Sequence, residues 1–405
     1  MTIGMIGMGK LGLPVALTIE SKGFKVLGYD ISPNPAKYLE EKKIPFVEKD
    51  IQPYLDKTKI EMVELKELIK QSDIIFCAIQ TPHDPRYEGT TRIPEERADF
   101  DYSYIKSCIE EVSKILAELK EKRTVAIIST MLPGTTDREL RPLMNEYFEM
   151  VYTPQFIAMG TVINDYLNPE FNLIGADNKE VAEKMTNFYL KINDAPPLVT
   201  DVVTAEAIKV SYNTFITTKT VLANLWGEIA HKTGANADQI FKAWSLSKKR
   251  LLSEKYLQAG MGDGGGCHPR DNIALSYLAD LTGMGYNYFD SLMLAREKHA
   301  EWQASLAVNA AQLSGLPIYI LGKAFKPETN IETGSPSILL SNILQEVGIK
   351  HFLSDEWVPL KAVVFIGCRH KEYKDIQFVK GSIVIDPFGY IKDQEGVTVV
   401  RIGRK

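Results

Sequence analysis

The sequence predicts an α/β fold class, with a large sheet domain first, a long central helix followed by further helices, and a smaller α/β domain last. Three observations predict it. Short apolar stretches alternate with stretches of helical period in residues 1–202, a helical pattern of roughly 30 residues follows, and strand and helix patterns alternate again near the end. Such alternation is typical of parallel sheets covered by helices. We therefore expect domains at residues 1–202, 203–312 and 313–405.

The composition limits the kinds of binding partner and the cellular compartment that we expect for this protein. The chain has 405 residues, of which 45% are hydrophobic and 24% charged, enough for several buried cores. Its net charge is −5, and its basic clusters carry glutamates at helical spacing, so nucleic acid is not expected as a partner. No apolar run reaches the roughly 18 to 20 residues that span a bilayer, and the start has no basic leader. We expect a cytoplasmic protein without a membrane partner.

The four cysteines, Cys77, Cys108, Cys267 and Cys368, are far apart in the sequence, with no C-x-x-C pair. This spacing suggests neither a metal site nor a disulfide framework, so we expect free thiols and no bound metal. Cys77 and Cys368 lie in apolar strand-like stretches and are expected to be buried. Cys267 differs, because it follows a run of glycines in "GDGGGCHPRD".

The N-terminal stretch predicts a dinucleotide site. A short apolar strand is followed by Gly7-x-Gly9-x-x-Gly12, a helical stretch and a second strand that ends before Asp30. In this βαβ context the first glycine permits a tight turn, the second admits a pyrophosphate and the third lets helix and strand pack, as in a Rossmann-type domain. Asp30 would accept a hydrogen bond from a ribose 2′-hydroxyl, which favours NAD over NADP. We place Lys10 in the same cofactor site.

Later strands end in polar residues. "SDIIFCAIQTP" ends in Thr81 and Pro82, "RTVAIISTMLPGTT" contains Thr130, and "EMVYTPQFIAMG" contains Gln155. Ligands of such sheets bind outside the carboxyl ends of the strands. We therefore expect Thr81, Pro82 and Thr130 to border the cofactor, and Gln155 to lie nearby.

From about residue 203 the pattern becomes one long helix, which Thr204 can cap and Gly234 can end. A helix of this length suits a connector whose apolar face pairs with a second copy of the chain, so we expect a homodimer. Lys209 and Asn213 are four residues apart and project from one face of this helix.

The stretch "GDGGGCHPRD" stands between helical patterns, with Arg270-Asp271 at its exit. This setting indicates an ordered loop that leads into a helix N-terminus, where the pKa of a thiol such as Cys267 is lowered. In the last domain, the loop of "IYILGKAFKPETN" carries Lys323 and Lys326, at a strand end where lysines can meet phosphate.

Together these motifs resemble the UDP-glucose/GDP-mannose dehydrogenase family. The resemblance rests on G-x-G-x-x-G with "GYD", then "STMLPGTT", "TPQFIAMGT", "AEAIKVSYNTF", "GGGCHPRD" and "GKAFKPETN", and it spans nearly the whole chain. It implies NAD-dependent oxidation of a nucleotide sugar at C6 from alcohol to carboxylate, with two hydride transfers. UDP-glucose is the substrate expected first. The implied fold is an NAD domain, a helical dimerisation region and a C-terminal domain that binds the nucleotide.

The resemblance also implies residue roles. Cys267 would attack the aldehyde as a thiolate and carry a thioester, which water activated near Asp271 would hydrolyse. Lys209 and Asn213 would stabilise the oxyanions, and Thr130 would help to place the water. The other residues implied in substrate binding are Phe156, Ile157, Tyr256, Gly265, Gly266, Phe325 and Lys326.

Some positions depart from the family. Its usual N-P-E-F-L is Thr153-Pro154-Gln155-Phe156-Ile157 here, so an amide replaces a carboxylate; it can orient water but cannot accept its proton. An arginine usual before E-S-P is Thr333, and the last domain is short. His268 is less favoured than Lys209 as the group that keeps the thiol ionised.

Alternatives remain open. The same chemistry on GDP-mannose or a UDP-N-acetylhexosamine is one. A two-electron dehydrogenase of the 3-hydroxyacid or 6-phosphogluconate type is another, although such enzymes lack a catalytic cysteine and a third α/β domain. A non-catalytic nucleotide-binding protein is the third, suggested by Gln155 alone.

Overall fold

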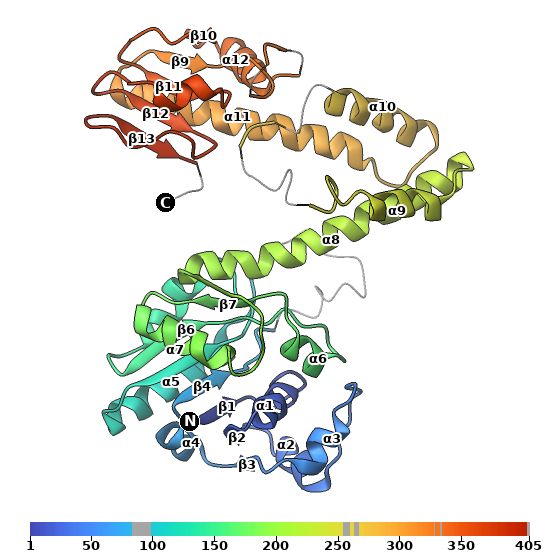
Figure 1. Ribbon diagram of the computed structural model, residues 1–405, viewed down its shortest axis with the longest axis vertical. Coiled ribbons are helices and arrows are strands. Elements are labelled where there is room, and N and C mark those ends of the chain that lie inside the picture. The colour runs from blue at the N-terminus through green and yellow to red at the C-terminus, as the bar shows by residue number, and fades with distance from the viewer. Residues whose placement is uncertain (83–98, 254–259, 263–266, 328, 333, 403–405) are drawn as a thin grey trace. The chain divides into compact units, whose positions relative to one another are not determined.

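The structure is a computed structural model that describes residues 1–82, 99–253, 260–262, 267–327, 329–332 and 334–402 (Figure 1). Four residues singled out in the sequence, Tyr256, Gly265, Gly266 and Thr333, lie outside these ranges. The chain forms two compact units, residues 1–219 and 220–405, and the boundary falls inside the long helix α8 (Val202–Thr233).

The first unit is built on an eight-stranded sheet with the order β3-β2-β1-β4-β5-β6-β7-β8 (Figure 1). Its pairs are parallel except for β6 and β7, which meet in an antiparallel bridge at Tyr152 and Gly175. The strands are β1 (Thr2–Ile6), β2 (Lys25–Tyr29), β3 (Glu61–Met62), β4 (Ile74–Cys77), β5 (Arg123–Ile127), β6 (Phe148–Tyr152), β7 (Asn172–Gly175) and β8 (Pro197–Thr200). The predicted parallel α/β class is confirmed, with this one antiparallel exception.

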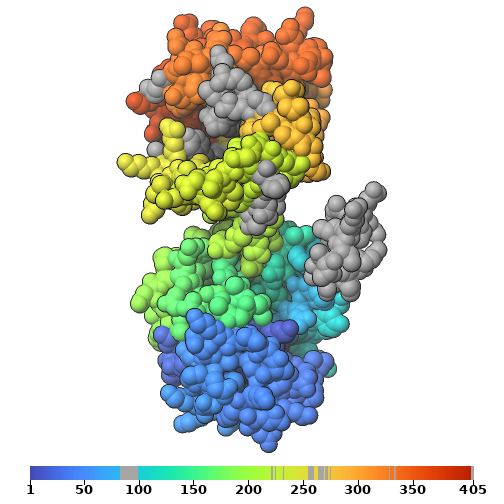
Figure 2. Space-filling view, turned by 90° about the vertical axis from the view of Figure 1, so that its right-hand side faces the viewer, coloured from blue at the N-terminus to red at the C-terminus, as the bar shows by residue number. Residues whose placement is uncertain are grey.

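Helices connect the strands of this sheet. They are α1 (Gly12–Ser21), α2 (Asn34–Glu41), α3 (Gln52–Lys57), α4 (Leu65–Gln71), α5 (Ser103–Leu119), α6 (Val162–Leu167) and α7 (Lys179–Tyr189), with a π-helical turn at Thr136–Leu140 and a 3₁₀ turn at Arg141–Leu143. On the surface of the unit, the blue segment near the N-terminus adjoins the green segment that contains β6 to β8 (Figure 2). Residues distant in sequence thus share one sheet and one surface.

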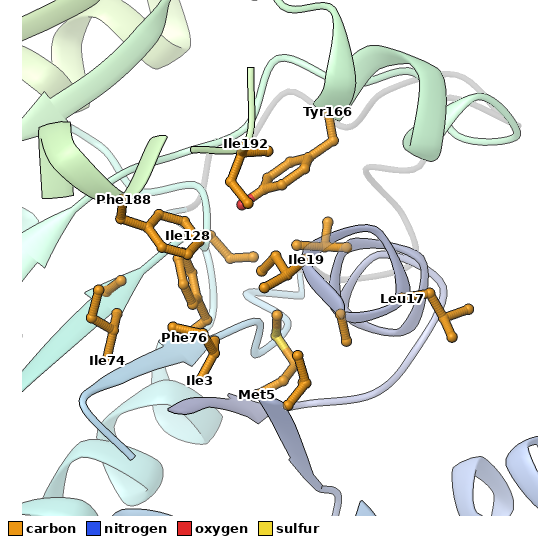
Figure 3. Packing of buried hydrophobic residues seen from close by; sticks show 14 of the residues in the cluster. Ile3, Met5, Leu17, Ile19, Ile74, Phe76, Ile128, Tyr166, Phe188 and Ile192 are labelled. Atoms are coloured by element: carbon orange, nitrogen blue, oxygen red, sulfur yellow. The ribbon is translucent and has the colours of Figure 1, made fainter. Parts of the chain in front are cut away.

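Two apolar cores lie on opposite faces of the sheet, because buried strands present side chains alternately to each face. Ile3 and Met5 of β1 point to one core, and Ile6 and Leu27 belong to the other. Figure 3 shows the first core, where side chains of α1, α6 and α7 meet those of β1 and β4. The rings of Phe76 and Phe188 stand there with centroids 5.4 Å apart.

The strands end earlier than the sequence predicts. Thr81 lies four residues beyond the end of β4, and Gln155 lies three beyond the end of β6. The reason is pairing: Cys77 pairs with the last residues of β1 and β5, and no strand continues beside it. These polar residues therefore lie on loops beyond the carboxyl edge of the sheet, where ligands of such sheets bind.

The second unit contains α9 (Ala237–Leu246), α10 (Cys267–Leu281), α11 (Tyr288–Ser314) and a five-stranded parallel sheet with the order β10-β9-β11-β12-β13 (Figure 1). Its strands are β9 (Ile318–Leu321), β10 (His351–Ser354), β11 (Val363–Ile366), β12 (Ile383–Asp386) and β13 (Thr398–Arg401), with α12 (Pro336–Glu346) and a 3₁₀ turn at Lys371–Asp375. The α/β pattern predicted for the last residues is confirmed.

Helix predictions are confirmed in part. α8 agrees with the helix expected between Thr204 and Gly234. Before the glycine-rich stretch, where a helical pattern is expected, α9 ends at Leu246; Ser247 leaves helical geometry and residues 248–253 form turns. Cys77 of β4 and Cys368, two residues beyond the end of β11, are 0% and 3% exposed, and the expectation that both are buried is confirmed. Among the described residues, no helix is long and apolar enough to cross a membrane.

Candidate active site

The glycine-rich turn after β1 has the geometry that its spacing predicts. Gly7 has φ +89°, and a Cβ at Gly12 would lie 1.8 Å from the Gly7 carbonyl oxygen, so both positions need glycine. A Cβ at Gly9 would meet nothing within 4 Å, which leaves open space against the backbone. No side chain caps the start of α1. The Leu13 N–H donates to the Gly9 carbonyl at 3.1 Å and Pro14 has no N–H, so a phosphate would meet the N–H groups that precede Leu13. The turn therefore fits a dinucleotide pyrophosphate.

Asp30 follows β2 beside this turn. One carboxylate oxygen accepts a hydrogen bond from the Met8 N–H at 2.7 Å, and the other accepts from the Ser32 N–H at 2.8 Å. These bonds fix the carboxylate next to the loop and leave each oxygen a further lone pair for a ribose hydroxyl. Lys10 is exposed on the loop itself. The expected positions of Asp30 and Lys10 beside the glycines are thus observed.

The loops after β4 and β5 are tied together. Thr81 donates a hydrogen bond to the Thr130 carbonyl at 2.9 Å, and Ser129 donates one to the Ile79 carbonyl at 2.5 Å. Pro82 follows directly and accepts a hydrogen bond from the Asp101 N–H at 2.7 Å. The structure therefore brings Thr81, Pro82 and Thr130 to one place.

Glu206 of α8 holds the next part of the same loop. This glutamate is 0% exposed and accepts hydrogen bonds from the Gly134 N–H at 2.6 Å, the Thr136 N–H at 2.8 Å and the Thr136 hydroxyl at 2.6 Å. The buried carboxylate is thereby stabilised by three donors. Glu206 was not singled out in the sequence, because nothing in "AEAIK" shows which loop will meet it.

A cavity of about 350 Å³ lies at the start of α8 and the loop after β6. Four residues expected to bind substrate line it together: Phe156, Ile157, Lys209 and Asn213. The remaining lining residues are Ala158, Asp165, Asn168, Pro169, Glu170, Phe171, Tyr212 and Ile216. The sequence spacing placed Lys209 and Asn213 on one face, and the structure joins that face to Phe156 and Ile157, which lie more than 50 residues earlier in the sequence.

Lys209 is the buried cation of this cavity, 8% exposed. Its ammonium donates a hydrogen bond to the Gln155 carbonyl at 2.7 Å and lies 5.0 Å from the centre of the Phe156 ring. Burial lowers the pKa of Lys209 below the ordinary value of lysine. The ring of Phe156 is in turn packed against Phe171 and Tyr212, with centroids 4.9 Å and 4.7 Å away.

Gln155 lies beside this cavity and lines a smaller one with Thr153 and Tyr189. Its side-chain nitrogen donates to the Thr153 carbonyl at 2.8 Å and to the Tyr189 hydroxyl at 3.1 Å. The sequence indicated an amide in place of a carboxylate but could not show what holds it. Tyr189, Phe171 and Tyr212 are further residues that sequence reasoning missed, because aromatic residues at these spacings are usual in any core.

The remaining expected residues belong to the second unit. α10 begins at Cys267, and Asp271 follows one turn later in the same helix, so the glycine-rich stretch does lead into a helix N-terminus. Phe325 and Lys326 follow β9, with the Lys326 ammonium 5.3 Å from the centre of the Phe325 ring. The Lys323 N–H donates a hydrogen bond at 2.7 Å to the carboxylate of Asp355, the residue that follows β10. Among the described residues, no group of three or more His, Cys, Asp or Glu residues could hold a metal ion.

Comparison with known proteins identifies the relatives. Residues 1–193 match the NAD-binding domain of the UDP-glucose/GDP-mannose dehydrogenase family, and residues 203–296 match its central domain. A GDP-mannose 6-dehydrogenase of Azotobacter vinelandii is 28% identical over 363 residues, covering 88% of this chain and 81% of that protein. A UDP-glucose 6-dehydrogenase of Rickettsia bellii is also 28% identical, over 364 residues, covering 85% and 79%.

Solved structures agree in fold. A GDP-mannose dehydrogenase of Pseudomonas aeruginosa, solved as a ternary complex, has a TM-score of 0.87 at 23% identity, with 98% of this chain and 99% of that chain covered. The matches run through the NAD-binding domain and the central domain, as the motif order predicts, and they do not favour the two-electron alternatives. The chain belongs to the UDP-glucose/GDP-mannose dehydrogenase family and is an NAD-dependent nucleotide-sugar dehydrogenase.

Proposed function

We propose that this enzyme oxidises C6 of the hexose in a nucleotide sugar from alcohol to carboxylate, with UDP-glucose or GDP-mannose as substrate. The observation that carries the proposal is the cavity in which Lys209 and Asn213 meet the loop of Phe156 and Ile157, in the same unit as the glycine-rich turn. A buried ammonium beside an amide can stabilise an oxygen atom that becomes negatively charged during a reaction. Because the two relatives are equally identical to this chain, identity does not choose between the two substrates.

In the proposed first oxidation, Lys209 and Asn213 hydrogen-bond to the C6 oxygen as it loses its proton to a water molecule. NAD supplies the hydride acceptor in both oxidation steps. The burial of Lys209 strengthens its interaction with an oxyanion, since little water competes for it. The same two side chains then polarise the carbonyl of the aldehyde toward attack at C6.

In the second oxidation, Cys267 acts as the nucleophile. Its thiolate adds to the aldehyde carbon and forms a C–S bond and an alkoxide, which Lys209 and Asn213 stabilise. Loss of a hydride from this carbon leaves a thioester. Water placed by Thr130 and Gln155 attacks the thioester and gives one proton to Asp271. The C–S bond breaks and releases the thiolate and the carboxylic acid, which then gives its remaining proton to solvent water.

The stoichiometry of NADH tests the reaction. Purified enzyme is incubated with UDP-glucose, GDP-mannose or a UDP-N-acetylhexosamine, and NADH is counted against sugar consumed. We expect two NADH for each sugar with the true substrate. One NADH for each sugar would favour the two-electron alternative, and no NADH with any of the donors would contradict the proposal.

The role of the thiol has its own test. Cys267→Ser should prevent completion of the second oxidation while NAD still binds, because a serine hydroxyl is a far weaker nucleophile than a thiolate. Mass spectrometry of the wild-type protein quenched during turnover should detect a thioester on the peptide that contains Cys267. A serine variant that forms uronate at the wild-type rate would rule out covalent catalysis.

We also propose that the enzyme is a homodimer through its helical region, with residues 1–202, 203–312 and 313–405 as its domains. Ile273, Tyr277 and Leu281, four residues apart on α10, are 61%, 69% and 67% exposed and form an apolar stripe. The core beneath is small: Ile229, Ala279 and Phe289 are its buried members among the described residues. A second copy of the chain would cover the stripe and supply the missing core.

The dimer can be tested by light scattering coupled to gel filtration. Tyr277→Asp with Leu281→Asp should convert the dimer to monomer, because two charges would be buried in the apolar contact. The control Leu313→Asp changes a leucine that is 89% exposed outside the stripe, and it should leave the mass unchanged. A monomeric wild type would contradict the proposal.

The C-terminal unit is proposed to bind the nucleotide. Phe325 and Lys326 stand on the loop after β9, where parallel sheets commonly place ligand contacts, and Lys326 is exposed and free to meet a phosphate. Lys326→Ala should raise KM for the nucleotide sugar several-fold and leave KM for NAD unchanged. Equal changes in both constants would count against this assignment.

A further inference from the structure

A buried chain of hydrogen bonds fixes the side chain of Gln155. Its nitrogen Nε2 donates to the Thr153 carbonyl at 2.8 Å and to the Tyr189 hydroxyl at 3.1 Å. The Tyr189 oxygen lies 2.6 Å from the Thr153 hydroxyl oxygen, and that hydroxyl donates to the Leu173 carbonyl at 2.8 Å. Thr153 and Tyr189 are only 1% and 2% exposed, so water does not replace these contacts.

One assignment of protons satisfies every bond in this chain. The Leu173 carbonyl can only accept, so the single proton of the Thr153 hydroxyl is used there. In this assignment the Tyr189 hydroxyl donates to Thr153 and accepts from Gln155. Both hydrogens of the Gln155 nitrogen are therefore used, one toward Tyr189 and one toward the Thr153 carbonyl.

This chain of hydrogen bonds reaches Lys209 through the backbone carbonyl of Gln155. The Gln155 carbonyl accepts the hydrogen bond from the Lys209 ammonium at 2.7 Å. Gln155 is thus held at its side chain by Tyr189 and Thr153, and its main chain holds Lys209. Tyr189 lies at the end of α7 and does not line the cavity that contains Lys209.

We propose that Tyr189 is a positioning residue for the oxidation, whose hydroxyl fixes the Gln155 amide and, through the Gln155 carbonyl, the place of the Lys209 ammonium. The inference rests on the proposed function. It also explains the amide at position 155: two acceptors face this side chain, so two donated hydrogens satisfy it and a carboxylate would oppose the Thr153 carbonyl. The hydrogen bonds around Tyr189 thus use both hydrogens of a neutral amide.

The test is steady-state kinetics on Tyr189→Phe, which removes the hydroxyl and keeps the ring. We expect kcat to fall roughly five- to tenfold, the usual effect of one lost hydrogen bond, with KM for the nucleotide sugar nearly unchanged. Tyr152→Phe is the matched control, because it removes an equally buried hydroxyl outside this chain of bonds and should leave kcat unchanged. Thr153→Val breaks the same chain at its next link and should lower kcat in the same way.

A double-mutant cycle separates positioning from general destabilisation. In a Gln155→Leu background, Tyr189→Phe should have no further effect on kcat, because Tyr189 acts only through Gln155. Additive losses, or an unchanged kcat in Tyr189→Phe and Thr153→Val, would overturn the inference. Wild-type enzyme that reduces no NAD with any nucleotide sugar would instead overturn the proposed function, and this inference with it.

Discussion

Substitution of alanine for Gly12 and for Gly9, two glycines of the same turn, should have two different effects. In Gly12→Ala the new Cβ would lie 1.8 Å from the Gly7 carbonyl oxygen, about 1.5 Å closer than the roughly 3.3 Å of an ordinary carbon–oxygen contact. In Gly9→Ala the new Cβ would meet nothing within 4 Å. The first substitution should therefore disturb the fold, and the second should disturb only a ligand that approaches the turn.

The magnitudes follow from these contacts. Alanine at position 12 gains about 1 kcal/mol of helix propensity, but the overlap is with backbone that cannot move aside, so overpacking should dominate and destabilise by about 1–3 kcal/mol net. Alanine at position 9 should change the free energy of unfolding by less than about 0.5 kcal/mol. Its methyl group would stand where the pyrophosphate approaches, so the Kd for NAD should rise at least about tenfold, or about 1.4 kcal/mol.

Urea denaturation and titration with NAD, followed by protein fluorescence, measure the two effects separately. We expect Gly12→Ala to lower the unfolding midpoint, and Gly9→Ala to keep the midpoint and weaken NAD binding. The reasoning would be refuted if Gly12→Ala unfolds at the wild-type midpoint, or if Gly9→Ala binds NAD as the wild type does.

Three further predictions concern Lys209, Glu206 and Gln155. Burial lowers the pKa of Lys209, so kcat should fall as pH rises through that lowered pKa. Lys209→Arg keeps its charge and should move this alkaline limb of the pH–rate profile to higher pH. An unmoved limb would contradict the assignment. Glu206→Ala leaves the buried donors of residues 134–136 unpaired and should lower the free energy of unfolding, measured by urea denaturation, by about 3 kcal/mol. Glu206→Gln should lower it less. A loss below about 1 kcal/mol in Glu206→Ala would show that the loop finds other acceptors. Gln155→Glu should lower kcat, because its carboxylate would face the Thr153 carbonyl; a higher kcat in a pH–rate profile would show that this position can serve as a base.

Much of the fold was predictable from local pattern. The turn of Gly7, Gly9 and Gly12 follows from spacing alone, because the steric demands of a tight turn and a close helix act within one βαβ unit. α8 was predictable for the same reason, since helical period and end signals are local. The strand ends were not, because the end of β4 is set by the lengths of β1 and β5 on either side of it.

The site divides in the same way. The spacing of Lys209 and Asn213 determined that they share a helix face, and the residue types indicated their chemistry. Only the tertiary structure decided that this face meets Phe156, that Glu206 holds the loop after β5, and that the hydroxyl of Tyr189 holds Gln155. The physical reason is range: backbone sterics and helical period act between residues near in sequence, whereas burial and the pairing of buried polar groups depend on which distant segments the sheet brings together.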